Sequence, residues 1–142
     1  MLRQVESLAL TLPGPVDRVG DLPVPDYFDF FEAVGPSPVR DDLVPLIMPM
    51  ETARGCWWGQ KYQCKFCAFQ ESLVGFRSKE PDRVLREMDE LVARHGDWML
   101  MLSDDIVDTR YFGTVFAELA RRGAPYGIFT ELKANQIGRA HV

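Results

Sequence analysis

The sequence predicts an α/β domain with about three parallel strands and two helices, because strand-like and helix-like segments alternate along it. The predicted order is a strand in 43–50, a long loop, a helix over 81–95, a strand over 98–102, a helix over about 109–121 and a strand over 128–133. Such alternation is typical of parallel βαβ units. The pattern ends after three strands, so we expect the N-terminal part of a partial (β/α) barrel, truncated before the remaining strands.

Composition and charge limit the possible functions. The chain has 142 residues, of which 46% are hydrophobic and 26% charged, as in one small globular domain. A net charge of −5 argues against a general nucleic-acid binder. No apolar run reaches the roughly 18 residues of a membrane span, and no signal peptide is visible. An odd count of three cysteines fits reduced thiols in the cytoplasm better than a disulfide framework.

Residues 1–40 are predicted to be an interdomain linker without its own core, because proline recurs through them. A short helix or turn is expected at 28–33, where Phe30 and Phe31 lie. The domain proper is expected to span 41–135. Its first apolar run contains Pro45 and Pro49, which favour a strand at the edge of a sheet or the ends of a strand.

The helix over 81–95 is the clearest element, with proline in its first turn and Gly96 as its stop. Its apolar side chains repeat at helical spacing and form one face: Val84, Leu85, Met88, Leu91 and Val92. The run from 98 to 102 is continuously apolar and predicts a strand covered on both faces.

The second helix, over about 109–121, is expected to stop at Gly123. In the strand that follows, Glu131 and Lys133 would share a face with Phe129. Charged groups there are costly unless paired or functional, so a mutual salt bridge and a binding role both stay open.

The sequence from Cys56 to Cys67 has the spacing C-x7-C-x2-C, which brings three potential thiolate ligands into one loop. Thiolates select zinc or iron–sulfur clusters. A structural zinc site wants four protein ligands, and neither His95 nor His141 is well placed to be the fourth. Three cysteines and an open position fit a 4Fe-4S cluster. The alternatives are three incidental core cysteines, or a zinc site completed by a missing segment.

Acidic residues follow the second predicted strand, at Asp104 and Asp105. The cysteine loop follows the first strand, and ligands of parallel sheets lie at the carboxyl ends of strands. We therefore expect the two aspartates beside the cysteines, with a helix N-cap as the alternative role.

The last seven residues, 136–142, carry no hydrophobic pattern or turn signal. Codons of a common sequencing-library adapter encode 137–142 and then a stop, and Gln136 fits a codon that is partly adapter. We expect these residues to be an artefact that truncates the natural gene, with a genuine short tail as the alternative.

Longer sequence blocks resemble the radical S-adenosylmethionine (SAM) C-methyltransferases that mature ribosomally synthesised peptides. The sequence block that shows this resemblance most specifically is Glu-Thr-Ala-Arg-Gly-Cys-Trp-Trp-Gly-Gln-Lys at 51–61, followed by Cys-Lys-Phe-Cys at 64–67. Further similar blocks lie at 76–79, 105–112 and 131–135, and the resemblance covers about 22–135. The chain departs from the family at Gln63, where members usually have histidine. It also departs at Asp105, where they have asparagine.

The resemblance implies a 4Fe-4S cluster on Cys56, Cys64 and Cys67, with SAM on its open iron. It implies that an external electron donor reduces the cluster, which cleaves SAM to a 5′-deoxyadenosyl radical that attacks a carbon of a peptide substrate. It places Phe66 near the adenine and Asp104 or Asp105 on the SAM amino group, a charge-assisted hydrogen bond.

The remaining implications concern binding contacts and a second cofactor. Lys79, Glu131 and Lys133 are weaker candidates for contacts to substrate or to the SAM carboxylate. The methyl donor would be cobalamin, bound by a missing domain upstream of residues 1–40. The competing hypotheses are an iron–sulfur or zinc module without radical chemistry, and an inactive truncated fragment.

Overall fold

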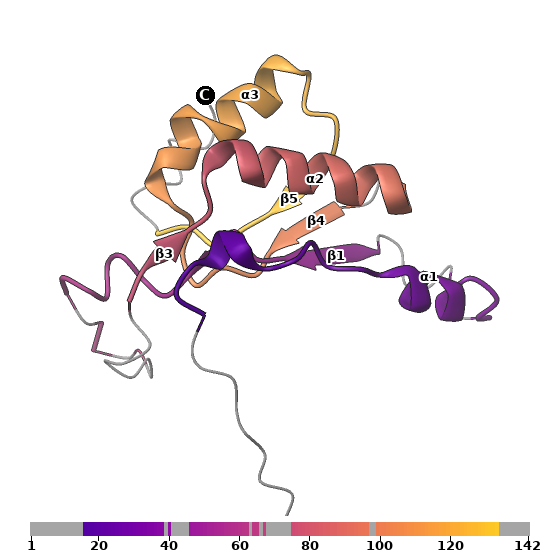
Figure 1. The fold of residues 1–142 in the computed structure, drawn as a ribbon, viewed down its shortest axis with the longest axis horizontal. Helices are drawn as coiled ribbons and strands as arrows, with labels where there is room; N and C mark the ends of the chain where they lie inside the picture. The colour runs from indigo at the N-terminus through magenta and orange to yellow at the C-terminus, as the bar shows by residue number, and fades with distance from the viewer. Residues whose placement is uncertain are drawn as a thin grey trace, which may run out of the picture.

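A three-stranded parallel sheet with helices on one face forms the core of the computed structural model. The structure describes residues 16–38, 40, 46–62, 64–65, 67, 75–96 and 99–133. The sheet has the order β1-β4-β5, with strands β1 (Ile47–Met50), β4 (Met99–Leu102) and β5 (Ile128–Phe129). Helices α2 (Pro81–His95) and α3 (Val115–Arg121) pack on each other and cover one face (Figure 1). The α/β class and the parallel sheet are thus confirmed, and the described sheet is open.

The N-terminal segment lies against this core. It contains a 3-10 turn, η1 (Val19–Asp21), and a short helix, α1 (Phe28–Val34), which confirms the helix expected at 28–33. Val19 is buried, and the Tyr27 hydroxyl donates a hydrogen bond to the Pro49 carbonyl. Helix α1 extends away from the body at one end of the molecule (Figure 1). The role of 1–40 as an interdomain linker stays a prediction.

The register of the sheet separates a buried face from an open one. Met48 pairs with Leu100 and Met50 with Leu102, and all four side chains are buried beneath the helices. Strand β1 lies at an edge of the sheet, as its prolines predict. The alternate residues form the other face, where Ile47 is 42% and Phe129 53% exposed. The expected cover on both faces of β4 is therefore wrong for the described residues, in which the helices lie on one side only.

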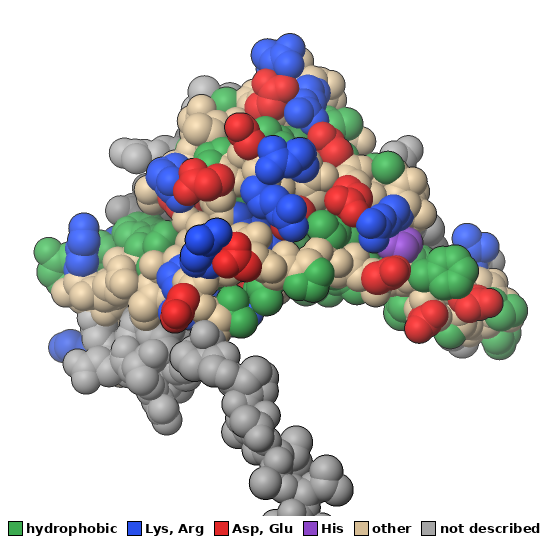
Figure 2. Space-filling model, viewed as in Figure 1, with side chains coloured by type: hydrophobic (Ala, Val, Ile, Leu, Met, Phe, Trp, Pro, Cys, Tyr) green, Lys and Arg blue, Asp and Glu red, His purple; other side chains and the backbone are tan. Residues whose placement is uncertain are grey.

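Helix α2 spans the predicted residues. Val84, Met88 and Leu91 are fully buried, because the 3.6-residue repeat puts them all on the side that faces the sheet. The outward surface carries acidic and basic side chains side by side (Figure 2). Arg122, the residue that follows α3, contacts Asp89 of α2 at 2.9 Å, so an ion pair also connects the ends of the two helices.

The second predicted helix is broken, which corrects the expectation of one helix over 109–121. A 3-10 segment, η4 (Thr109–Gly113), precedes α3, and Thr114 between them has the non-helical dihedrals φ −127° and ψ −79°. Two physical causes act at this point. Gly113 and Thr114 are poor helix formers, and the Asp108 side chain caps the first segment by accepting from the Arg110 N–H. Helix α3 ends where expected, at Gly123 with φ +82°.

Strand β5 is shorter than expected and ends at Phe129. Its partner β4 ends at Leu102, and the loop after β4 continues the contact: the Val107 N–H donates to the Glu131 carbonyl at 3.3 Å. Glu131 and Lys133 therefore lie beyond the strand. Their side chains do not follow the strand pattern in which every second residue lies on the same face.

A second, two-stranded sheet was not predicted. Strand β2 (Ala53–Arg54) pairs antiparallel with β3 (Arg77–Ser78). The pairing brings the two ends of the cysteine loop together. Two-residue strands give no periodic signal, so no sequence pattern reveals them.

Candidate functional site

The site expected from the sequence lies where β1, β4 and β5 end. The cysteine loop leaves β1 through Glu51 and Thr52. Arg54 and Glu51 form a two-pronged ion pair, with contacts of 2.5 and 2.7 Å. Gly55 then takes φ +82°, a left-handed conformation that glycine adopts without strain. The loop therefore leaves the sheet in a fixed direction.

The first half of the loop is a compact helical turn. The Gln60 N–H donates to the Cys56 carbonyl at 3.1 Å, and the Tyr62 N–H donates to the Trp58 carbonyl at 2.8 Å. The Gly59 N–H lies 3.3 Å from Cys56 Sγ. A backbone donor aimed at sulfur stabilises a thiolate and is one of the contacts that tune iron–sulfur centres.

The three cysteines are half-buried, and none forms a disulfide. The Cys67 N–H donates to the Cys64 carbonyl at 3.1 Å, so these two residues share one turn. Among the residues that the structure describes, no three His, Cys, Asp or Glu side chains stand together as a metal-holding group. The donors fit an iron–sulfur cluster by chemistry and by their place in one loop. Their convergence on one centre stays a prediction, and Phe66 lies outside the described residues.

Asp104 is buried at 3% exposure and accepts hydrogen bonds from the start of the loop. Its Oδ1 accepts from the N–H groups of Thr52 at 2.7 Å and Ala53 at 2.9 Å, and its Oδ2 accepts from the Thr52 hydroxyl. Desolvation by burial raises the pKa of Asp104, and these hydrogen bonds oppose the rise. The carboxylate thus fixes the exit from β1. Its contact with SAM stays a prediction.

Asp105 is exposed and also accepts a hydrogen bond from the loop. Its Oδ2 accepts the Gly55 N–H at 3.2 Å, one residue before Cys56. The structure therefore places Asp105 beside the first cysteine, as expected from the order of the strands.

Lys133 and Glu131 do not pair with each other. The Lys133 ammonium lies 3.1 Å from the centroid of the Trp58 ring, a cation–π contact with the cysteine loop. Glu131 is exposed, and no ion pair joins it to Lys133 in the described part of the chain. The sequence left two interpretations of this pair open, a mutual salt bridge and a binding role. The salt bridge is not observed.

Lys79 points into the core. Its ammonium contacts Glu87 at 2.6 Å, and both side chains are almost completely buried. Arg83 contacts the second oxygen of the same carboxylate at 2.5 Å. This charge cluster joins the loop's return strand to α2, so Lys79 acts here as a structural residue.

The sequence pattern places Tyr111 on the buried face of the second predicted helix and gives no role to Trp57, yet both side chains form hydrogen bonds that hold the cysteine loop. The Tyr111 hydroxyl is buried between the carbonyls of Thr52 and Lys79, at 3.1 and 2.7 Å, and so connects both ends of the loop. Burial raises the pKa of Tyr111. The Trp57 indole N–H donates to the Val107 carbonyl at 2.9 Å. Both residues lie in the quoted family blocks, which was the available signal.

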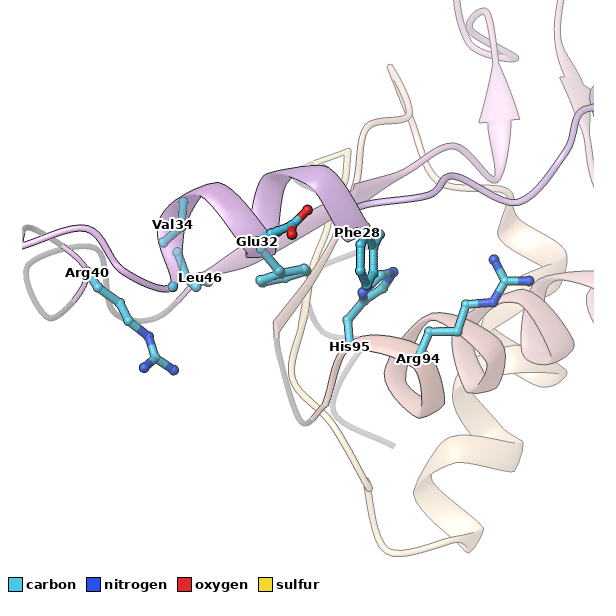
Figure 3. Close-up of a pocket in the computed structure, with 9 residues that line it drawn as sticks. Phe28, Glu32, Val34, Arg40, Leu46, Arg94 and His95 are labelled. Atoms are coloured by element: carbon cyan, nitrogen blue, oxygen red, sulfur yellow. The ribbon is translucent and has the colours of Figure 1, made fainter.

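A separate cavity of about 420 Å³ lies at the opposite end of the sheet, between α1 and the end of α2 (Figure 3). His95 stacks on Phe31 there, with ring centroids 5.1 Å apart. Arg40 and Arg94 also line it. The cavity is remote from the cysteines, in line with the expectation that His95 is not one of their co-ligands.

Comparisons with protein-family models, with curated proteins and with solved structures gave no match to this chain. No helix in the described residues is long and apolar enough to cross a bilayer.

Proposed function

We propose that this chain is part of a radical SAM enzyme that methylates a carbon of a ribosomally synthesised peptide. One observation supports this most: three free cysteines share a loop that leaves the carboxyl end of a parallel strand. That edge of an α/β sheet is where ligands usually bind. The cobalamin, the peptide substrate and a barrel completed by further strands rest on the resemblance alone.

Cys56, Cys64 and Cys67 would hold a 4Fe-4S cluster with one open iron. When reduced by an external donor, such a cluster supplies the electron that splits SAM into methionine and a 5′-deoxyadenosyl radical. The protein's own contribution is to hold the thiolates and orient SAM. The Gly59 N–H stabilises negative charge on Cys56 Sγ.

Asp105 is the better placed of the two aspartates to accept from the SAM amino group. Its contact in the described structure uses Oδ2, and the side chain is exposed beside Cys56. Asp104 has both oxygens engaged by Thr52 and Ala53. Asp104 would instead stabilise the start of the loop that contains the three cysteines.

The test is anaerobic reconstitution of the 142-residue chain with iron and sulfide, followed by electron paramagnetic resonance of the reduced sample with and without SAM. We expect a 4Fe-4S signal whose g-values shift when SAM is added. Replacing Cys56, Cys64 or Cys67 with alanine should each remove most of the iron, since each substitution deletes one thiolate ligand. Asp105→Ala should retain the cluster and weaken the response to SAM, because it removes the side-chain acceptor for the SAM amino group.

Two results would contradict the proposal. A cluster signal that ignores SAM would favour an iron–sulfur module without radical chemistry. Iron or zinc content that is unchanged in the cysteine variants would remove the thiolates from the metal site.

A further inference from the structure

Lys133 is joined to the cysteine loop by its contact with Trp58. Its Nζ lies 3.1 Å from the ring centroid, well inside the roughly 6 Å at which cations and aromatic rings attract. Trp58 stands two positions after Cys56, whereas Lys133 follows β5. Strands β1 and β5 are the two edges of the described sheet. The contact therefore spans the sheet from the loop of one edge to the end of the other.

The ring is supported on its other sides by aromatic neighbours. Tyr62 lies 4.7 Å from Trp58, centroid to centroid, and Trp57 meets it edge-on at 6.2 Å. Trp57 is itself fixed by the Val107 carbonyl, in the loop after β4. The loop is thus attached to the ends of all three strands, and Lys133 provides the attachment at β5.

The charge of Lys133 is directed at the ring and at no carboxylate of the described residues. Its near neighbour Glu131 makes no ion pair with it, and Lys133 is half-buried. A partly desolvated ammonium is attracted to an indole face more strongly than one in free solvent. The geometry thus favours an indirect role for Lys133 over the direct ligand contact that the sequence suggested.

We propose that Lys133 is a positioning residue: acting through Trp58, it holds the cysteine loop over the carboxyl ends of the strands. The consequence for cluster retention rests on the proposed function. The consequence for the loop itself does not, because it follows from the contact alone.

The first experiment is limited trypsin digestion of the whole chain without metal, with cleavage sites assigned by mass spectrometry. Lys61 and Lys65 lie in the loop and are exposed, so cleavage after them reports on how firmly the loop is held. We expect Lys133→Met and Trp58→Leu each to speed this cleavage roughly two- to thirtyfold, the range that corresponds to loss of one cation–π contact. Lys133→Arg should stay near the unmodified rate, because a guanidinium also binds an aromatic face.

The double variant of Lys133→Met with Trp58→Leu decides whether the two residues act together. It should be cleaved no faster than the faster single variant, since both changes break the same contact. Arg86→Met, which removes an exposed cation from α2, is the control and should leave loop cleavage unchanged. If circular dichroism shows that Trp58→Leu does not fold, Trp58→Phe replaces it with a smaller expected effect.

The second experiment measures iron release to a chelator from the reconstituted chain. Lys133→Met should release iron several-fold faster, and Lys133→Arg at the unmodified rate. Loop cleavage or iron release that Lys133→Met leaves unchanged overturns the inference, as do effects that simply add in the double variant. An unmodified chain that binds no cluster would count against the proposed function, while the digestion would still decide the role of Lys133.

Discussion

Asp104 shows how one side chain can hold a site whose chemistry belongs to its neighbours. Three donors from Thr52 and Ala53 converge on its carboxylate, from a segment 51 to 52 positions earlier in the chain. Pairs of this kind are invisible to sequence periodicity, because nothing local links the two partners. The sequence predicts that Asp104 follows the second strand. Its structural role depends on burial and on hydrogen bonds, which the sequence does not reveal.

Asp104→Ala should lower the free energy of unfolding by about 2–4 kcal/mol, because the buried N–H groups of Thr52 and Ala53 lose their acceptor. Urea unfolding followed by circular dichroism measures the change. Asp105→Ala is the matched control: that side chain is exposed and should cost less than about 1 kcal/mol. Equal losses for the two variants would contradict this assignment.

The same carboxyl should give stability a pH dependence. Burial raises the pKa of Asp104 above its ordinary value. A carboxyl with a raised folded-state pKa contributes most stability below its ordinary pKa and loses that contribution as the pH rises through the folded value. The unfolding free energy of the unmodified chain, relative to Asp104→Asn, should therefore fall as the pH is raised from the ordinary carboxyl range towards neutrality.

At the scale of elements, prediction succeeded where a long periodic pattern met a clear stop. Helix α2 has both: a repeating apolar face and the Pro81 and Gly96 ends. It failed where short-range chemistry interrupts a pattern, as at Thr114, or where two-residue strands pair, as in β2 and β3. The position of the cysteine loop followed from strand order, whereas its attachments depend on tertiary contacts.

The buried charges of Lys79 and Glu87 attach α2 to strand β3. Glu87→Leu should destabilise the chain by about 3–5 kcal/mol, since it leaves the Lys79 ammonium buried without its partner. Adding Lys79→Met should restore most of that loss, because the apolar pair fills the same space without charge. Both are measured by urea unfolding.

An exposed pair on the same helix is the control. Glu90 contacts Arg94, and both side chains are 40% or more exposed, so Glu90→Leu should change stability by less than about 1 kcal/mol. A Glu87→Leu variant as stable as Glu90→Leu would show that the buried pair does not hold the helix.

At the scale of the whole molecule, the sheet has one covered and one open face. Among the residues that the structure describes, Phe129 lies on the uncovered face and β5 has no strand partner on its outer edge, and such features are ones through which sheets associate. Phe129→Lys should therefore lower the self-association of the chain, seen as a smaller rise of weight-average mass with concentration in sedimentation equilibrium. Phe28→Lys, at an exposed phenylalanine of α1, should not. A larger loss of self-association in Phe28→Lys than in Phe129→Lys would place the associating surface on α1.

The attachments of the cysteine loop also set an order of events during synthesis. The loop is made first, but Asp104 follows Thr52 by 52 positions, and Val107 follows Trp57 by 50. Lys133 comes later still. A ribosome releases the chain from its N-terminus, so the three thiols emerge well before Asp104, Val107 and Lys133. During that interval they are open to oxidants and to stray metal ions, and the last attachment to form is the one at the end of β5.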